Sequence, residues 1–346
     1  MQWTRLSTQG FGGDDADLTH ASAGEQQETK PVLKVSGLRV SYLTKQGMVR
    51  AVDNVDFCID RGEFVGLSGE SGCGKTTTAM AIMRLLPREG IIEGGEVDFN
   101  GMNVLAFAKR NIEAFRWKDV SMIFQGAMNA LNPVHRVVDQ MIDAIRIHED
   151  ISKEKARERA IELVESVGIE RSRASAYPHE LSGGMKQRLM IALSLVLHPT
   201  LVIADEPTTA LDVMIQAQIL DLFRQLRNKT SLSLLIITHD LSVLAETCDK
   251  VIIMYAGKIV EEAPTDKLFN EPAHPYTKKL IASFPSILAD KEIDYIPGNP
   301  PDLIDPPSGC NFHPRCDYAI DICAQKEPPL DDEDGHRAAC FRRHEI

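Results

Sequence analysis

The stretch GESGCGKT, residues 69 to 76, decides the fold class of this chain. It fits the pattern G-x-x-x-x-G-K-[ST], in which glycines let backbone N–H groups turn inward around phosphates. Lys75 is expected to neutralise charge on the β and γ phosphates, and the Thr76 hydroxyl to reach Mg²⁺. The residues expected to bind the nucleotide are Gly69, Glu70, Ser71, Gly72, Cys73, Gly74, Lys75, Thr76 and Thr77.

The context of this loop supports the functional interpretation over a chance match in a glycine-rich turn. The apolar run FVGLSG before it is typical of a strand, and TTTAMAIMRLLP after it has helical spacing up to Pro87. A strand, a glycine loop and a helix in this order are what a phosphate-binding loop requires. Within the loop, Cys73 is expected to be a small filler, because the backbone does the binding.

The rest of the chain predicts an α/β fold with a mainly parallel sheet. Residues 32 to 68 contain short strand-like runs, residues 139 to 168 predict two amphipathic helices, and residues 200 to 262 alternate strands with helices. Beyond about Pro264 prolines are frequent, so we expect no regular elements there. The predicted organisation is a disordered acidic tail (1–30), a nucleotide-binding domain (31–265) with a helical subdomain at about 126–190, and an extension (266–346).

Composition excludes several classes of function. The 346 residues carry a formal net charge of −12, which would repel a nucleic-acid backbone, so no nucleic-acid partner is expected. No run of about 18 apolar residues is present to cross a membrane, and the first 30 residues lack the apolar stretch of a secretory signal. These features predict a cytoplasmic compartment, in which thiols stay reduced.

The segment LVIADEP, residues 201 to 207, is an apolar strand that ends in two carboxylates. Ligands of open α/β sheets bind at the carboxyl ends of strands. We expect Asp205 to hold Mg²⁺, directly or through water, and Glu206 to act as general base on the attacking water. Taken alone, an Asp-Glu pair after a strand is also common in turns. Because the same chain carries a phosphate loop, we favour the functional interpretation.

The segment ELSGGMKQR, residues 180 to 188, places Ser-Gly-Gly at the start of a predicted helix and so forms a second anion-binding helix N-terminus. One nucleotide does not need two such cradles on one chain. With these motifs together, the chain from Val32 to its end resembles the ATP-binding subunits of ABC transporters, and more closely those of oligopeptide, dipeptide and nickel importers. The resemblance implies an ABC-type P-loop NTPase fold with an antiparallel β-subdomain and a helical subdomain.

The resemblance also implies roles for individual residues. Two ATPase subunits of this family pair head to tail, so that the signature of one closes over the ATP of the other. Gln125 is then placed to reach Mg²⁺ and the attacking water, and His239 to contact the γ-phosphate. The signature is carried by Ser182, Gly183, Gly184 and Met185, the aspartate that crosses the dimer interface is Asp212, and the aromatic on adenine is Tyr42. Each of these types alone is more often a surface or packing residue.

By resemblance, the function is ATP hydrolysis that drives an importer. The implied partners are two integral-membrane permease subunits, a second, similar but non-identical ATPase subunit and, indirectly, an external solute-binding protein. The implied location is the cytoplasmic face of the membrane. The resemblance implies peptides as the transported substrate, with oligosaccharides as an alternative. The rival class is a soluble ABC-type ATPase of translation or DNA repair. This class is disfavoured because the chain has a single nucleotide-binding domain and a negative net charge.

Four of the seven cysteines, Cys310, Cys316, Cys323 and Cys340, lie in the last 37 residues of the chain. Their spacing fits neither a zinc ribbon nor a bacterial ferredoxin run, so it leaves disulfides, free thiols and a metal site open. The resemblance implies a [4Fe-4S] cluster on these four residues, with zinc as the second choice. His313 and His336 are possible substitutes for a cysteine ligand. Cys58 and Cys248 are expected in the core.

Overall fold

The computed structural model describes residues 30–126, 130–209, 211–229, 231–283 and 296–346. The tail predicted at residues 1–30 falls, apart from Lys30, outside the described residues. Among the helices of the described ranges, none is long and apolar enough to span a membrane.

The main sheet has eight strands in the order β11-β12-β10-β9-β3-β8-β7-β6. Five neighbouring strands, β9, β3, β8, β7 and β6, run parallel to one another, which confirms the prediction of a mainly parallel core. The other three are antiparallel additions at one edge. The bounds are β3 Phe64–Ser68, β6 Val120–Ile123, β7 Leu201–Asp205, β8 Ser233–Ile237, β9 Lys250–Tyr255, β10 Lys258–Pro264, β11 Asp331–Glu333 and β12 His336–Ala338.

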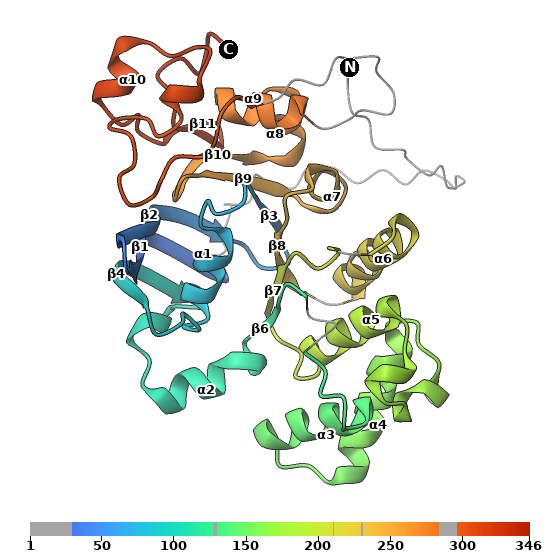
Figure 1. The fold of residues 1–346 in the computed structure, drawn as a ribbon. Coiled ribbons are helices and arrows are strands. Elements are labelled where there is room, and N and C mark those ends of the chain that lie inside the picture. The colour runs from blue at the N-terminus through green and yellow to red at the C-terminus, as the bar shows by residue number, and fades with distance from the viewer. Residues whose placement is uncertain (1–29, 127–129, 210, 230, 284–295) are drawn as a thin grey trace, which may run out of the picture.

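Alternate residues of the parallel strands feed two separate hydrophobic cores, one on each face of the sheet. Leu234 and Ile236 of β8 join one core and Leu235 and Ile237 join the other. Side chains of strand neighbours point to opposite faces, so continuous apolar runs are needed where both faces are covered. One face is covered by α1 (Lys75–Ile82), and the opposite face by α5 (Gly183–Ser194), α6 (Val213–Lys229) and α7 (Leu241–Thr247) (Figure 1).

An antiparallel sheet lies on the α1 side of the core. Its order is β2-β1-β4-β5. The strands are β1 Leu33–Thr44, β2 Gly47–Ile59, β4 Gly90–Phe99 and β5 Met102–Asn103. Buried residues of these strands share a core with α1, so this sheet fixes the helix that follows the phosphate loop.

Helices between β5 and β7 form the lower part of the molecule in Figure 1. The two amphipathic helices predicted within residues 139–168 are present as α3 (Val137–His148) and α4 (Lys153–Ser166). They pack on each other, and α4 also packs on α5. α2 (Lys109–Lys118) and the short 3₁₀ turns Val104–Ala106, Arg171–Ser175 and Pro178–Glu180 complete the region.

Two predictions about helices were wrong. α1 ends at Ile82 instead of continuing to Pro87, because Arg84 has a left-handed φ of 50° that a helix cannot contain. The extension does contain regular elements: α8 Thr265–Asn270, α9 Pro275–Ala282, the 3₁₀ turn His313–Arg315 and α10 Asp321–Gln325. Pro275 is compatible with α9 because it occupies the first turn, where its missing N–H would have no partner.

The extension is joined to the main sheet. β12 pairs with β10 through Glu261↔Ala338 and Glu262↔Arg337. Glu261, which is fully buried, accepts hydrogen bonds from the backbone N–H groups of Ala273 and His274, and its Oε1 lies 2.7 Å from His336 Nε2. The extension is therefore fixed against β10, the last strand of the nucleotide-binding domain.

Candidate nucleotide-binding and hydrolysis site

The phosphate loop follows β3 and leads directly into α1. Gly69, Gly72 and Gly74 have positive φ values of 147°, 80° and 105°. A Cβ on Gly69 would lie 2.1 Å from the Met254 carbonyl oxygen, and one on Gly74 would lie 2.2 Å from that of Ala51. Only glycine fits at these two positions, so the spacing in the sequence motif reflects both backbone conformation and close packing.

Lys75 is buried at the start of α1 and turns back onto the loop. Its Nζ donates hydrogen bonds to the carbonyl oxygens of Gly69 at 2.7 Å and Glu70 at 2.9 Å. The ammonium group is thus held inside the curve of the loop, where a bound phosphate would meet it. Cys73 is buried as the sequence predicted for a filler, and burial raises the pKa of its thiol.

Asp205 ends β7 beside the start of α1. It is 2% exposed, and its Oδ1 has no hydrogen-bond partner among the described residues. Burial raises the pKa of Asp205, against the opposing effect of a hydrogen bond from the Thr76 side chain. A buried carboxylate oxygen without a partner beside a threonine hydroxyl is the donor set that Mg²⁺ prefers, so these residues fit the expected ion.

Glu206 is the centre of a cluster of polar side chains. It has a left-handed φ of 48°, and its backbone N–H donates to the Ile237 carbonyl oxygen at 2.7 Å. Gln125 Nε2 donates to Glu206 Oε2 at 2.7 Å, and His239 Nδ1 lies 3.2 Å from Oε1. Three side chains predicted from separate segments therefore meet in one place.

The topology explains this meeting. Gln125 follows β6, Glu206 follows β7 and His239 follows β8, and these strands are parallel neighbours. The carboxyl ends of parallel strands lie at one edge of the sheet, and the phosphate loop follows β3, the next strand across. The arrangement can bind a phosphate chain and hold a carboxylate beside it.

Thr209 is a residue of this cluster that the sequence did not single out. Its hydroxyl donates to Glu206 Oε2 at 3.0 Å. The sequence did contain a signal for Thr209, because this residue stands three positions after Glu206 in the same segment, DEPTT. Threonine and serine are frequent in turns, and that frequency hides such a role in a single sequence.

The remaining expected site residues lie in two places. Tyr42, at the end of β1, has its hydroxyl 3.3 Å from Thr77 Oγ1, which places its ring beside the start of α1. Ser182 is the exposed N-cap of α5 and accepts from the Met185 N–H at 3.3 Å, and Gly183 and Gly184 begin the helix as predicted. α5 and α1 lie on opposite faces of the sheet, so the signature is separated from the phosphate loop of its own chain (Figure 1).

Asp212 lies at the start of α6, near the signature helix. Its Oδ1 accepts from the Ile215 N–H at 2.9 Å, and Ile215 packs against Gly184, where an added Cβ would meet its Cγ2 at 2.9 Å. Asp212 and the signature thus belong to one neighbourhood.

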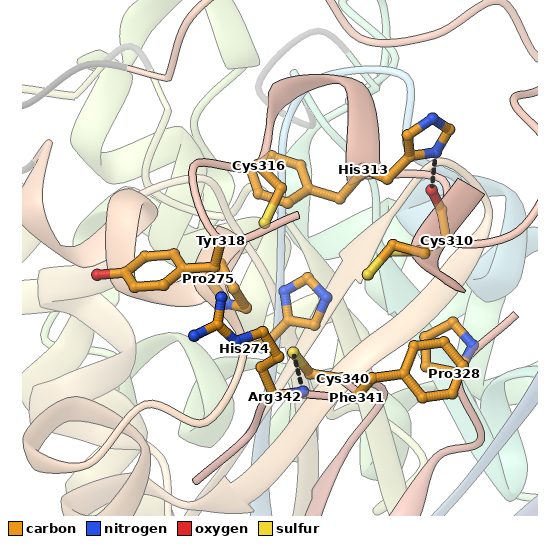
Figure 2. Close-up of a pocket in the computed structure, with 12 residues that line it drawn as sticks. His274, Pro275, Cys310, His313, Cys316, Tyr318, Pro328, Cys340, Phe341 and Arg342 are labelled. Carbon is orange, nitrogen blue, oxygen red and sulfur yellow. Dashed lines mark hydrogen bonds between the residues drawn. The ribbon is translucent and has the colours of Figure 1, made fainter. Parts of the chain in front are cut away.

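The four terminal cysteines line one pocket. Figure 2 shows Cys310, Cys316 and Cys340 around a common space with His274, and Cys323 completes the set. Burial raises the pKa of both Cys310 and Cys316 to about 11. No group of three or more His, Cys, Asp or Glu side chains within the described ranges is arranged to hold a metal ion.

Other thiols and histidines lie elsewhere. His313 lines the pocket, but its Nδ1 is 2.9 Å from the Cys310 carbonyl oxygen, and His336 is bonded to Glu261 and is not a lining residue. Cys248 is buried as predicted, whereas Cys58 is only half-buried. Disulfides are absent among the described cysteines, since all seven thiols are free.

Comparisons with known proteins agree with these features. The family model described as ABC transporter matches residues 52–209, and the one described as Oligopeptide/dipeptide transporter, C-terminal region, matches residues 260–323. The oligopeptide transport ATP-binding protein OppD of Bacillus subtilis is 46% identical over 304 residues, covering 86% of this chain and 85% of that protein. OppD of Escherichia coli is 43% identical over 320 residues, covering 92% and 95%.

A solved structure extends the similarity to the fold. The dimeric, post-hydrolysis structure of the ATP-binding cassette MJ0796 bound to ADP and Pi has a TM-score of 0.61 and 26% identity, and it covers 67% of this chain and 98% of that one. With the phosphate loop, the Glu206 cluster and the two matched regions on one chain, the chain belongs to the ABC transporter ATPases, among the ATP-binding proteins that carry the oligopeptide/dipeptide C-terminal region.

Proposed function

We propose that this chain is the ATP-hydrolysing subunit of an importer that takes up oligopeptides or dipeptides through a membrane permease. The observation that carries the hydrolytic part is the meeting of Gln125, Glu206 and His239 at the edge of the sheet that also holds the phosphate loop. The peptide substrate is supported by the names of relatives that match over most of the chain and by the matched C-terminal region.

In this proposal the nucleotide lies along the phosphate loop, with adenine against Tyr42. Lys75, already aimed into the loop, stabilises negative charge on the phosphates. Thr76, Gln125 and Asp205 would hold Mg²⁺, which would supply positive charge to offset that of the phosphates.

Glu206 acts as the general base in the proposed mechanism. Its carboxylate accepts the proton of the attacking water, while the bonds from Gln125 and Thr209 fix its orientation. The left-handed backbone at Glu206 and the bond from its N–H to Ile237 hold the side chain at the sheet edge. His239, with 65% of its side chain exposed, remains accessible to the γ-phosphate.

The signature residues Ser182, Gly183, Gly184 and Met185 would close over the ATP of a second ATPase subunit, with Asp212 crossing the same interface. Support comes from the exposed residue Ser182, which caps the N-terminus of a helix on the opposite face of the sheet from α1. The further partners proposed are two permease subunits, a similar, non-identical ATPase subunit and, indirectly, an external solute-binding protein, with the chain peripheral at the cytoplasmic face of the membrane.

For the cysteine pocket we propose a [4Fe-4S] cluster, with zinc as the second candidate. Support comes from four thiols that line one pocket and from its apolar surroundings, which include Pro275, Phe312 and Pro328. Thiolates are the usual ligands of such clusters. A mononuclear zinc ion needs its ligands close around one point, and the described thiols are not grouped in that way.

The decisive experiment is phosphate release by the transporter purified from its own membrane with the bound permease. Stimulation by a peptide-loaded binding protein, and not by an oligosaccharide-loaded one, would support the proposal. Purification of the chain with RNA or DNA and without integral-membrane proteins would contradict it and favour the soluble class of ABC-type ATPases.

A further inference from the structure

The C-terminal extension bonds to the phosphate loop at Glu70. Both carboxylate oxygens of Glu70 bind the Arg315 guanidinium, with Nη1 to Oε2 at 2.7 Å and Nη2 to Oε1 at 3.0 Å. The backbone N–H of Glu70 donates to the Tyr276 hydroxyl at 2.8 Å. Neither Arg315 nor Tyr276 belongs to the sequence motifs of the nucleotide site.

Arg315 is fully satisfied and rigidly placed. A guanidinium has five N–H donors, and each has a partner here. Besides Glu70, these are the carbonyl oxygens of Pro297 at 2.7 Å and Gly298 at 3.3 Å, and the Tyr255 hydroxyl at 3.2 Å. The Arg315 side chain is only 7% exposed, so solvent screens this ion pair weakly.

An aromatic group supports the same contact. The rings of Tyr255, Tyr276 and Phe312 lie with centroids 4.7 to 5.3 Å apart, and the Arg315 guanidinium lies 5.8 Å from the Tyr255 ring. Tyr255 belongs to β9, Tyr276 to α9 and Phe312 to the segment before Arg315. The contact is thus part of the packed junction between the extension and the sheet.

The charge of Glu70 needs a partner at this position. A carboxylate on the phosphate loop repels the anionic phosphates that the loop binds, and the repulsion is strong in a partly buried site. A bidentate arginine cancels that charge while its geometry fixes the carboxylate. Removing the arginine alone would leave an uncompensated negative charge beside the site.

We propose that Arg315 is a positioning residue for nucleotide binding: it neutralises Glu70 and, together with Tyr276, fixes the conformation of the phosphate loop. ATP affinity then depends on the extension as well as on the nucleotide core. The inference rests on the proposed phosphate-binding role of residues 69–76.

The test measures the affinity of the full-length chain for a fluorescent ATP analogue in four forms: wild type, Arg315→Gln, Arg315→Lys and Glu70→Gln/Arg315→Gln. Arg315→Gln should weaken binding about tenfold or more, because it exposes the Glu70 charge. Arg315→Lys keeps the charge without the five-donor fork, so its loss should be smaller. The double variant removes both charges and should recover most of the lost affinity.

The recovery separates positioning from a merely structural role. If Arg315 only anchors the extension, the double variant binds no better than Arg315→Gln, which overturns the proposal; so does an Arg315→Gln affinity within twofold of wild type. Should Arg315→Gln fail to fold, the comparison between Arg315→Lys and the double variant still decides, because neither leaves a buried unpaired charge.

Glu327→Gln is the matched control. It breaks another ion pair between extension and core, Lys258 Nζ to Glu327 Oε1 at 2.8 Å, at a side chain that is 56% exposed. Its affinity should equal that of wild type, and an equal loss would show general loosening of the extension and overturn the proposal. Lys75→Ala tests the phosphate loop itself: if ATP binding survives that change, the proposed nucleotide site fails whatever Arg315 does.

Discussion

The structure organises the nucleotide site and the cysteine pocket differently, although sequence motifs and the family resemblance pointed to both. Around Glu206, side chains that follow three neighbouring strands are already joined by bonds of 2.7 to 3.2 Å. Around the cysteine pocket, four thiols share a space, but no three are arranged as metal ligands within the described residues. Hydrogen bonds therefore hold the side chains of the first cluster in place, whereas the second gathers its thiols without fixing them.

The difference follows from the elements that carry the residues. The residues of the Glu206 cluster directly follow strands whose register and two-sided burial fix the position of the backbone there. Of the four cysteines, Cys323 lies in the short helix α10 and the other three lie in irregular segments, and the Cys310 N–H donates to the Cys323 carbonyl oxygen at 2.8 Å. Such segments bury little apolar surface, and a bound metal can supply the missing folding energy.

The comparison predicts its largest effect at Glu206. Glu206→Gln removes the proposed base while its amide can still occupy the same space, so phosphate release by the assembled transporter should fall by about 10² to 10⁴-fold with ATP binding retained. Glu246→Gln, at an exposed residue paired with Arg224, should leave turnover unchanged. Normal turnover in the Glu206 variant would contradict the assignment of the base.

The backbone of the phosphate loop provides the next test. Gly74→Ala would place a Cβ 2.2 Å from the Ala51 carbonyl oxygen, so we expect a loss of about 3 kcal/mol or more in the free energy of unfolding, with loss of ATP binding. Gly72 also has a positive φ, but nothing lies within 4 Å of its added Cβ. Gly72→Ala should therefore cost only about 1 to 2 kcal/mol. Chemical denaturation measures the free energy of unfolding of both variants. Equal losses in the two variants would show that the close packing of Gly74 against Ala51 is unimportant.

The cysteine pocket is tested by its metal content. Cys323→Ser removes one of the four proposed ligands, so protein purified without oxygen should lose its visible absorbance and most of its iron. Cys58→Ser, at a thiol outside the pocket, should keep both. Colourless wild-type protein with stoichiometric zinc, or with no metal, would refute the cluster and leave the ATPase assignment intact.

The smallest effect is expected at Thr209. Thr209→Val removes the hydroxyl that donates to Glu206 but keeps the branched shape, so turnover should fall about five- to tenfold with the KM for ATP unchanged. Thr209→Ser keeps the donor and should restore most of the rate. A change in KM without a change in kcat would show that Thr209 acts on binding instead of on the base.

Local patterns predicted much of the fold, because they encode local structure. Three local patterns each indicate a backbone conformation directly. They are the apolar runs of β3 and β7, the periodicity of α3 and α4, and the glycine spacing of the phosphate loop. The helix at Pro275 was missed, because a proline signals a helix start as well as a break. The Arg315–Glu70 contact could not be predicted, since it joins residues 245 positions apart and has no local pattern.

That separation has a consequence for the growing chain. At about 5 to 20 residues per second, a ribosome needs about 12 to 50 s to pass from Glu70 to Arg315. During this time the nascent chain has its phosphate loop but lacks the arginine that cancels the loop's negative charge. If Arg315 acts as proposed, the chain gains its full affinity for ATP only late in synthesis. An incomplete chain released before Arg315 is added would therefore bind ATP weakly.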